Sequence, residues 1–285
     1  MQIEINTFIQ VNLKKLTNKT FSKKYISQYI TPIIKNINNS EHKKFIIAGS
    51  QGAGKSTLAK LFKLVLENRY KKKVMLLSID DYYLSKNKRV KLSKKIHPLL
   101  STRGVPGTHD IVALKNDIIN FQTKNFPITT PIFNKLKDDT SIKKKIIKNA
   151  EILLLEGWCC GTPSINTKYL FQNINRVETL LDKNKKWRQY YNSQLKMEYK
   201  KVFSLFDQQI YIEPPSFNYV LKWRYTQEKN NALKSRNKDF MNKKELQTFI
   251  QHYEKLTRWM MKIMPAKADI LIKIDSNQKI KKIII

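Results

Sequence analysis

Residues 49–56 of the chain, GSQGAGKS, place two glycines, a lysine and a serine at the spacing G-x-x-x-x-G-K-[ST]. This spacing is typical of a phosphate-binding loop. Backbone N–H groups of such a loop face the phosphates, and a side chain at Gly52 or Gly54 would block their approach. We expect Lys55 to reach the β- and γ-phosphates of ATP and Ser56 to hold Mg²⁺. The predicted nucleotide-binding residues are Gly49, Ser50, Gln51, Gly52, Ala53, Gly54, Lys55, Ser56 and Thr57.

Glycine is scarce in this chain, and its distribution is informative. All seven glycines of the 285 residues lie in three short segments, 49–54, 104–107 and 157–161. Because glycine permits backbone angles and close approaches that other residues do not, we expect it where a ligand or a tight turn requires it. The three segments are therefore predicted to form the working site. A purely structural turn at the first segment is disfavoured, because an apolar run precedes it and a helical pattern follows it.

Acidic residues end two apolar runs. Asp80 and Asp81 follow the run that begins at residue 73, and Glu156 ends the run that begins at residue 150. A carboxylate beside a phosphate loop can accept a proton from a substrate hydroxyl, and we assign this catalytic role to Asp80. Glu156 is expected to hold Mg²⁺, directly or through water. The alternatives are a helix cap or surface pair for the aspartates, and an ion pair with Lys55 for Glu156.

The loop STRGVPGTHD, residues 101–110, carries Arg103 and His109 between glycines and a proline. The planar fork of arginine holds carboxylates bidentately, so Arg103 is predicted to bind an anionic group of the substrate. His109 belongs to the same predicted substrate site, with a helix cap as the alternative. Asp81 and Tyr83 complete the predicted substrate-binding set.

A helical stretch further along the chain carries Arg224, Gln227 and Glu228, and Arg236 follows it. A cation on a segment that closes over the nucleotide would stabilise the charge that develops on the transferring group. We therefore predict that Arg224 is catalytic, together with Lys55 and Asp80. The alternative is a helix face held by salt bridges.

Strands and helices alternate along the sequence. Apolar runs predict strands at residues 43–50, 73–80, 150–157, 208–215 and 268–275, and helical patterns are found at 20–38, 184–206, 216–230 and 243–262. This order predicts an α/β protein with a P-loop NTPase fold, in which helices flank a parallel five-stranded sheet. We expect an N-terminal helical segment, residues 1–40, and one domain, residues 41–285. Substrate and lid insertions are expected at about 84–149 and 222–245, with residues 135–149 on the surface.

The formal net charge is +33, but only eight of the 55 basic residues are arginine. Lysine is spread along the whole chain beside abundant asparagine and isoleucine, a pattern typical of A-rich codons. We interpret the charge as solvated surface, with a polyanion-binding face as the alternative. The adjacent Cys159 and Cys160 do not suit a disulfide or a zinc site. No apolar run of 18 residues and no signal-peptide pattern is present, so we expect no membrane partner and a cytoplasmic location.

Seven segments together resemble the plant-type D-glycerate 3-kinase family, within the phosphoribulokinase and uridine kinase group of P-loop kinases. They are GSQGAGKSTLA, SIDDYYLS, HPLLSTRGVPGTHDI, LLLEGWCCG, KWRQYYNSQL, PPSFNYVLKWRYTQE and HYEKLTRWMMKIMPAKADILIKID. The resemblance implies transfer of phosphate from ATP to D-glycerate, with Asp80 as the base, Glu156 as the third-strand acid and Arg224 in a lid-side R-x-x-Q-E. Two positions depart from the family pattern. Asn134 stands where many members have aspartate, and His97 where plant and fungal members have asparagine.

The sequence therefore predicts a Mg²⁺- and ATP-dependent kinase whose other partner is a small hydroxylated acceptor that carries a carboxylate, D-glycerate above all. Within the same class, a nucleoside or pantothenate kinase is the alternative. From a different class, the positive charge favours a P-loop ATPase that is stimulated by nucleic acid. No helicase or switch motif follows Glu156, which argues against that class.

Overall fold

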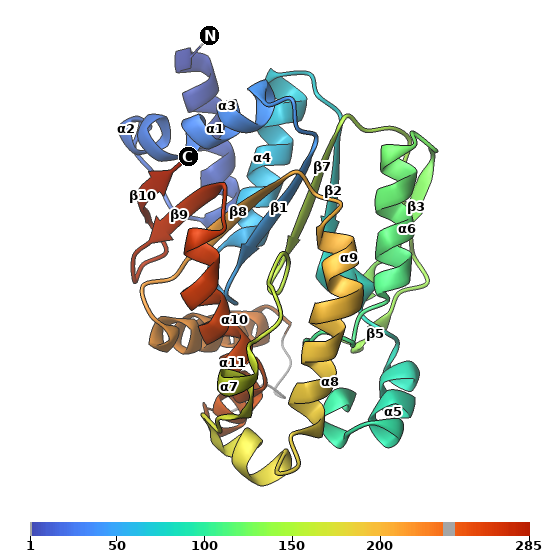
Figure 1. The fold of residues 1–285 in the computed structure, drawn as a ribbon. Coiled ribbons are helices and arrows are strands. Elements are labelled where there is room, and N and C mark those ends of the chain that lie inside the picture. Colours follow the sequence, from blue (N-terminus) through green and yellow to red (C-terminus); the bar gives the residue numbers. More distant parts are fainter. Residues whose placement is uncertain (1, 236–242) are drawn as a thin grey trace.

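The computed structural model describes residues 2–235 and 243–285, with side chains described for residues 5–226 and 247–285. Its centre is a six-stranded sheet with the strand order β10-β9-β8-β1-β7-β2 (Figure 1). The strands are β1 (Lys44–Gly49), β2 (Val74–Ser78), β7 (Ile152–Gly157), β8 (Gln208–Glu213), β9 (Ile270–Ile274) and β10 (Ile280–Ile284). The first five of these are parallel, and β10 pairs antiparallel with β9. The predicted α/β fold with five parallel strands is confirmed, and β10 adds a sixth strand.

Helices cover both faces of the sheet. Successive strand residues face opposite sides, and Phe45 and Ile47 pack into one apolar cluster while Ile46 and Ala48 pack into the other. The helices over the first cluster are α1 (Gln2–Thr17), α3 (Thr31–Asn39) and α4 (Lys55–Arg69). Those over the second are α6 (Ile111–Gln122), α8 (Lys186–Gln194), α9 (Lys200–Phe203) and α11 (Lys243–Ile263). Burial of both faces explains why the strands are nearly continuous apolar runs.

The N-terminal helices share their core with the rest of the chain. The predicted helix at 20–38 is found as a continuous helical segment formed by α2 (Lys23–Tyr25), the π-helical turn η1 (Ile26–Ile30) and α3. Helix α1 precedes it, within the N-terminal helical segment that we expected at residues 1–40. Ile9, Ile26 and Ile33 are fully buried in the same cluster as α4 and the sheet. The N-terminal segment therefore forms part of the hydrophobic core.

The region at 84–149, where we expected an insertion, contains helices and two short strand pairs. It comprises α5 (Lys86–Lys95), the 3₁₀ turn η3 (Pro98–Ser101), α6, the strand pair β3 (Ile128–Thr130) with β6 (Lys145–Ile147), and the pair β4 (Phe133–Asn134) with β5 (Asp139–Thr140). Strands of two or three residues are too short to show an alternating apolar pattern, so they could not be recognised from the sequence. We call residues 133–140 the β4–β5 hairpin.

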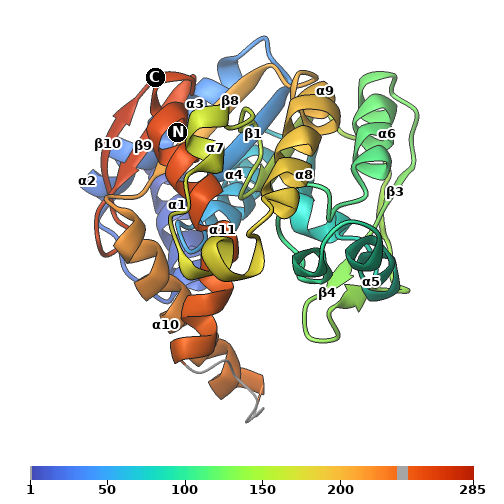
Figure 2. The same ribbon diagram turned by 60° about the horizontal axis from the view of Figure 1, so that its bottom comes forward.

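The remaining helical elements follow β7. They are α7 (Thr167–Phe171), η4 (Val177–Leu181), η5 (Leu195–Tyr199), α10 (Phe217–Ser235) and η6 (Met264–Ala266), and η5 joins α8 to α9. Helices α10 and α11 lie side by side and project beyond the body of the molecule, as Figure 2 shows. They correspond to the predicted lid region at 222–245. Among the described residues, no helix combines the length and apolar character needed to cross a bilayer.

Candidate active site

The predicted phosphate loop lies between the carboxyl end of β1 and the first turn of α4, as its mechanism requires. Gly52 has a φ of +76° and Gly54 a φ of +91°, in the left-handed region that favours glycine. Lys55 is 9% exposed, and its Nζ donates a hydrogen bond of 2.8 Å to the carbonyl oxygen of Ser50. Burial lowers the pKa of Lys55, although the charges of Glu156 and Asp80 act in the opposite direction. The side chain of Lys55 thus lies against the phosphate loop.

Polar atoms at the loop are suited to an anionic ligand. The hydroxyl of Ser50 and the side-chain amide of Gln51 are buried and have no hydrogen-bond partner in the described part of the chain. Buried polar groups without partners are uncommon in folded proteins. A triphosphate, whose oxygens accept hydrogen bonds, would satisfy the donors among them. The loop therefore fits the nucleotide that its sequence predicts.

Glu156 lies directly against the start of α4. Parallel pairing puts it level with Ile47 of β1 and Ser78 of β2. Its Oε1 accepts hydrogen bonds from Ser56 Oγ at 2.8 Å and Ser78 Oγ at 2.9 Å. The structure therefore brings together the two predicted Mg²⁺ ligands, a hydroxyl and a carboxylate, and a bound ion would complete its shell with phosphate oxygens and water. No ion pair joins Glu156 to Lys55 in the described residues, so the alternative role for this acid is not observed.

Asp80 lies at the carboxyl edge of the sheet, in the 3₁₀ turn η2 (Ile79–Tyr82) that follows β2. Its Oδ1 accepts a hydrogen bond of 3.1 Å from Tyr83 Oη, and its Oδ2 lies 2.6 Å from Lys135 Nζ. Burial raises the pKa of Asp80, but the ammonium of Lys135 outweighs it. With smaller contributions from His109 and Lys55, the pKa falls below its ordinary value. Asp80 is thus ionised at neutral pH, the state that a proton acceptor needs.

Asp81 is turned toward the β4–β5 hairpin. Its Oδ1 accepts a hydrogen bond of 3.2 Å from the N–H of Phe133. Burial raises the pKa of Asp81, with a further rise from the neighbouring charge of Asp80. The predicted substrate contact therefore ties η2 to the hairpin, and Asp80 is the aspartate that remains beside the loop lysine.

Tyr83 and His109 form a stacked pair behind Asp80. Their ring centroids are 4.4 Å apart at 22°, and His109 Nδ1 lies 2.6 Å from Tyr199 Oη. Burial lowers the pKa of His109 to about 4, so its ring is neutral at neutral pH. Its Nε2 is buried without a partner in the described residues. The cap of α6 is Asp110, whose Oδ1 accepts the N–H of Ala113, so His109 is not the helix cap.

Arg103 does not present a free guanidinium. It forms an ion pair with Asp138 of the β4–β5 hairpin and lies over the ring of Phe133, 5.5 Å from its centroid. The buried Arg89 binds the same carboxylate, with 2.8 Å between Nη2 and Oδ2. In this structure the predicted carboxylate-binding residue thus holds the hairpin of its own chain.

The hairpin supplies two residues that our sequence analysis did not assign. Lys135 reaches Asp80 from the stretch predicted to be surface, and its side chain is indeed 61% exposed. Asn134, the departure from the family pattern, caps the hairpin turn, since its Oδ1 accepts the N–H groups of Leu136 and Lys137 at 3.1 Å. In a chain with so much lysine, no local pattern distinguishes Lys135, because its partner is 55 residues away.

Helix α10 passes directly over the phosphate loop. A Cβ built on Gly52 would lie 2.7 Å from the Cβ of Trp223, and Gln278 Nε2 donates a hydrogen bond of 2.5 Å to the Gly52 carbonyl. Arg224 follows Trp223 and lies over the ring of Phe249, 5.7 Å from its centroid. The side chains of Gln227 and Glu228 and the whole of Arg236 lie outside the described residues. Arg224 is thus close in sequence to the loop contact, on the predicted lid helix.

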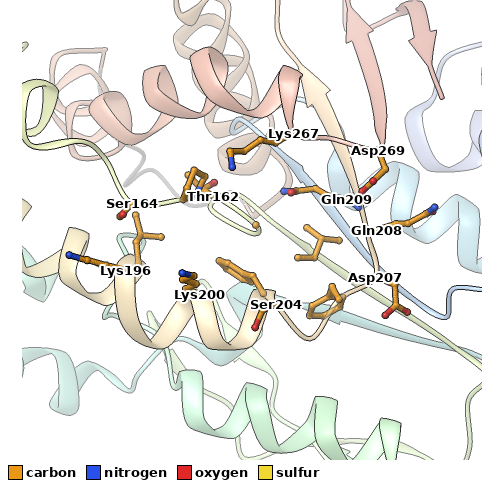
Figure 3. Close-up of a pocket in the computed structure, with 16 residues that line it drawn as sticks. Thr162, Ser164, Lys196, Lys200, Ser204, Asp207, Gln208, Gln209, Lys267 and Asp269 are labelled. Carbon is orange, nitrogen blue, oxygen red and sulfur yellow. Dashed lines mark hydrogen bonds between the residues drawn. The ribbon is translucent and has the colours of Figure 1, made fainter.

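Several cavities of the described residues are of the size that small ligands occupy, and two of them border the central sheet. One, of about 560 Å³, opens beside the phosphate loop. Its lining includes residues 52–58, Trp223, the β9–β10 turn and the aromatic rings of Phe21 and Tyr25. The other, of about 580 Å³, lies near the amino ends of β8 and β9 and is bordered by Lys200, Lys267 and Gln209 (Figure 3). It includes none of the predicted site residues, so the first cavity is the one connected to the chemistry.

Comparisons with known proteins agree with this geometry. The chain is 32% identical over 227 residues to an uncharacterized kinase, mug58, of Schizosaccharomyces pombe, a match that spans 73% of this chain and 76% of the relative. It is 25% identical over 215 residues to the chloroplastic D-glycerate 3-kinase of Arabidopsis thaliana, which spans 71% of this chain and 44% of the relative. No protein-family model matches the sequence.

A solved structure shows the same fold. The D-glycerate 3-kinase of Cryptococcus neoformans superposes with a TM-score of 0.73 at 21% identity, over 100% of this chain and 98% of that one. The parallel sheet, the loop between β1 and α4, and the match to mug58 all lead to one assignment. The chain belongs to the P-loop kinases of the phosphoribulokinase and uridine kinase group.

Proposed function

We propose that this protein is an ATP-dependent kinase that transfers the γ-phosphate of ATP to the 3-hydroxyl of D-glycerate, which yields 3-phosphoglycerate. The observation that carries the proposal is the convergence of three groups at one edge of the sheet. Lys55 of the loop, the Ser56–Glu156 pair and the ionised Asp80 all lie there. A switch or motor ATPase does not need a carboxylate placed to deprotonate an organic hydroxyl, whereas a small-molecule kinase does.

The loop and the adjoining cavity would hold the nucleotide. The amides of residues 50–56 and Lys55 would bind the phosphates, and the cavity of about 560 Å³ would take the base and ribose. Its aromatic rings, Phe21, Tyr25 and Trp223, provide flat apolar surface for a base. Ser56 and Glu156 would hold Mg²⁺, which when bound supplies positive charge against the phosphate oxygens.

The other residues act on the acceptor and the transferring group. Asp80 would take the proton of the attacking hydroxyl, with Tyr83 donating to its second oxygen and holding the carboxylate in orientation. Lys55 would neutralise charge on the transferred phosphoryl group, and Arg224 on α10 would add a second cation when the helix approaches. The neutral His109 can offer its unpaired Nε2 to an acceptor hydroxyl. Together these groups bind and orient the acceptor and remove its proton.

The names of two relatives support D-glycerate as the acceptor. The Arabidopsis and Cryptococcus proteins carry the name D-glycerate 3-kinase, and the sequence resemblance extends over Asp80, Glu156 and Arg224. The acceptor side is lined by cations and by hydrogen-bonding rings, which suit a small hydroxy acid. These likenesses support the substrate, and the assay below tests it.

The test is ADP release by purified protein against D-glycerate, L-glycerate, pantothenate and nucleosides, with and without RNA. We expect release with D-glycerate and formation of 3-phosphoglycerate, and we expect Asp80→Asn to lose both. Release that is unaffected by every small acceptor but rises with RNA would refute the kinase proposal. Transfer to pantothenate or a nucleoside instead would keep the kinase and replace its substrate.

A further inference from the structure

An acceptor that carries a carboxylate needs a cation to bind that group, close to the base that deprotonates its hydroxyl. Lys135, His109 and Lys55 each lower the pKa of Asp80, and Lys135 does so most, through its direct contact with the carboxylate. Two of them have other roles. Lys55 donates to the Ser50 carbonyl within the phosphate loop, and His109 is buried and neutral. Lys135 is the one whose charge is not already assigned to the nucleotide or lost by burial.

Arg103, which the sequence predicts to bind the acid group of the substrate, is paired with another residue of the chain. Arg103 and Arg89 both bind Asp138, and the hairpin that carries Asp138 also carries Lys135. The arginines therefore act as anchors for the hairpin. Their fork geometry is used within the chain, which leaves the acid of an acceptor to another cation.

The backbone of Lys135 is held in place by the hairpin, whereas its side chain is exposed to solvent. The hairpin is pinned by the Asn134 turn cap, by the Asp81–Phe133 hydrogen bond and by Asp138. The side chain itself is 61% exposed, and in the described residues its ammonium contacts only Asp80. An ammonium has three donors, so two of the three remain for an incoming anion.

We propose that Lys135 holds the acid group of the acceptor and leaves Asp80 to do so. This inference rests on the proposed function and names the residue behind its preference for a hydroxy acid. While Lys135 stays on Asp80, it shares the carboxylate that must receive the proton. An acceptor carboxylate draws the ammonium away and frees Asp80 Oδ2 for the hydroxyl of the same molecule. In D-glycerate one carbon separates the carboxylate carbon from the carbon that bears the 3-hydroxyl, so one molecule reaches both groups.

The experiment compares Lys135→Met with Lys137→Met, a matched control on the same hairpin whose exposed side chain has no partner in the described residues. The acceptors are D-glycerate and glycerol, which has the primary hydroxyl without the carboxylate. For Lys135→Met we expect kcat/KM for D-glycerate to fall about 10- to 100-fold, the usual size of one charge-assisted hydrogen bond. Glycerol turnover should not fall, and the KM for ATP should stay within about twofold. Lys137→Met should match the wild type.

Two results would overturn the inference. An equal loss with D-glycerate and glycerol would mean that Lys135 only orients Asp80, and no loss with either would mean that it does not contact the acceptor. Failure of the proposed function has a different signature, because the wild type itself would then not phosphorylate D-glycerate. In that case calorimetric binding of D-glycerate and pantothenate to wild type and Lys135→Met, with a non-hydrolysable ATP analogue present, decides the question. Equal binding, or none to the wild type, refutes the inference.

Discussion

The nucleotide side and the acceptor side of this site are built in different ways. On the nucleotide side, one continuous segment from β1 to α4 provides the loop, and backbone amides are its main ligands. On the acceptor side, η2, the 101–110 loop and the β4–β5 hairpin meet through side chains that are far apart in sequence, such as Asp80 with Lys135 and Arg89 with Asp138. A backbone site tolerates drift in the surrounding residues, whereas a side-chain site changes with each substitution. Substitutions on the acceptor side should therefore change binding more than substitutions around the loop.

The largest expected effects are on phosphate transfer, and they distinguish a residue of the nucleotide side from a residue of the acceptor side. Lys55→Ala should reduce phosphate transfer by at least about 10³-fold and also weaken ATP binding, because we propose that Lys55 binds the phosphates. Asp80→Asn should reduce transfer by about 10²- to 10⁴-fold and leave ATP affinity unchanged, because the role that we propose for Asp80 is proton transfer. Single-turnover kinetics with calorimetric titration of ATP measure both quantities. Loss of ATP binding in Asp80→Asn would show that the two sides are not separable in this way, and an unchanged thermal melt in Lys55→Ala would exclude a structural lysine.

The acceptor side should give the protein a distinctive sensitivity to acid. The pKa of His109 is about 4 in the folded chain and about 6.5 when unfolded. Between pH 6.5 and 4, His109 is protonated in the unfolded chain but not in the folded chain. The free energy of unfolding therefore falls as the pH drops from about 6.5 to 4. The full contribution is about 3 kcal/mol. Urea unfolding across this range should show a shallower pH dependence for His109→Gln. Since the pKa of the partly buried His252 is also lowered, the difference between wild type and variant isolates His109, and parallel curves would contradict the assignment.

Loosening the hairpin should affect the acceptor alone. Asp138→Asn removes the charge that Arg89 and Arg103 share, while asparagine tolerates the positive φ of 52° at this position. We expect the acceptor KM to rise about tenfold, because a charged hydrogen bond is worth about 1.5–3 kcal/mol, and the KM for ATP to stay the same. Steady-state kinetics with each substrate varied in turn would measure this. A rise in the KM for ATP would mean that the hairpin also supports the phosphate loop.

The smallest effect compares two glycines of the loop. Gly52→Ala puts a Cβ 2.7 Å from Trp223, whereas Gly54→Ala meets nothing within 4 Å, and both positions have positive φ. Both variants should lose about 1 kcal/mol of stability from backbone strain, and Gly52→Ala should lose a further 1–3 kcal/mol from the clash. Chemical denaturation without nucleotide gives the two values. Equal losses would mean that α10 does not rest on the loop in solution.

The nucleotide side could be predicted from the sequence because its signals are local. The motif from Gly49 to Ser56 and the apolar runs around it fix a strand, a loop and a helix within 30 residues. The link from Ser56 to Glu156 followed as well, because carboxyl ends of parallel strands share one edge. Strand β10 was missed, because it alternates isoleucine with lysine only weakly. Helix α1 was expected only as part of a helical segment at residues 1–40, without bounds of its own.

The acceptor side resisted prediction because its contacts depend on tertiary structure. Arg103 was predicted to bind a carboxylate of the substrate, but nothing local indicated that Asp138 of its own chain would pair with it. No sequence signal distinguishes Lys135 from the many other lysines, and its partner Asp80 is 55 residues earlier in the chain. The placement of Tyr199 beside His109, 90 residues apart, has the same character. Ion pairs and ring contacts of this kind become visible only when the sheet and its insertions are assembled.

Trp223 gives the protein a built-in optical probe. Its Cβ abuts the loop glycine at position 52, and its indole Nε1 donates a 2.9 Å hydrogen bond to Ser276 between β9 and β10. Indole emission responds to changes in local polarity and contact, so filling or emptying the loop should alter the fluorescence of this tryptophan. Nucleotide occupancy could then be followed in real time without a dye, a label or an added reporter enzyme.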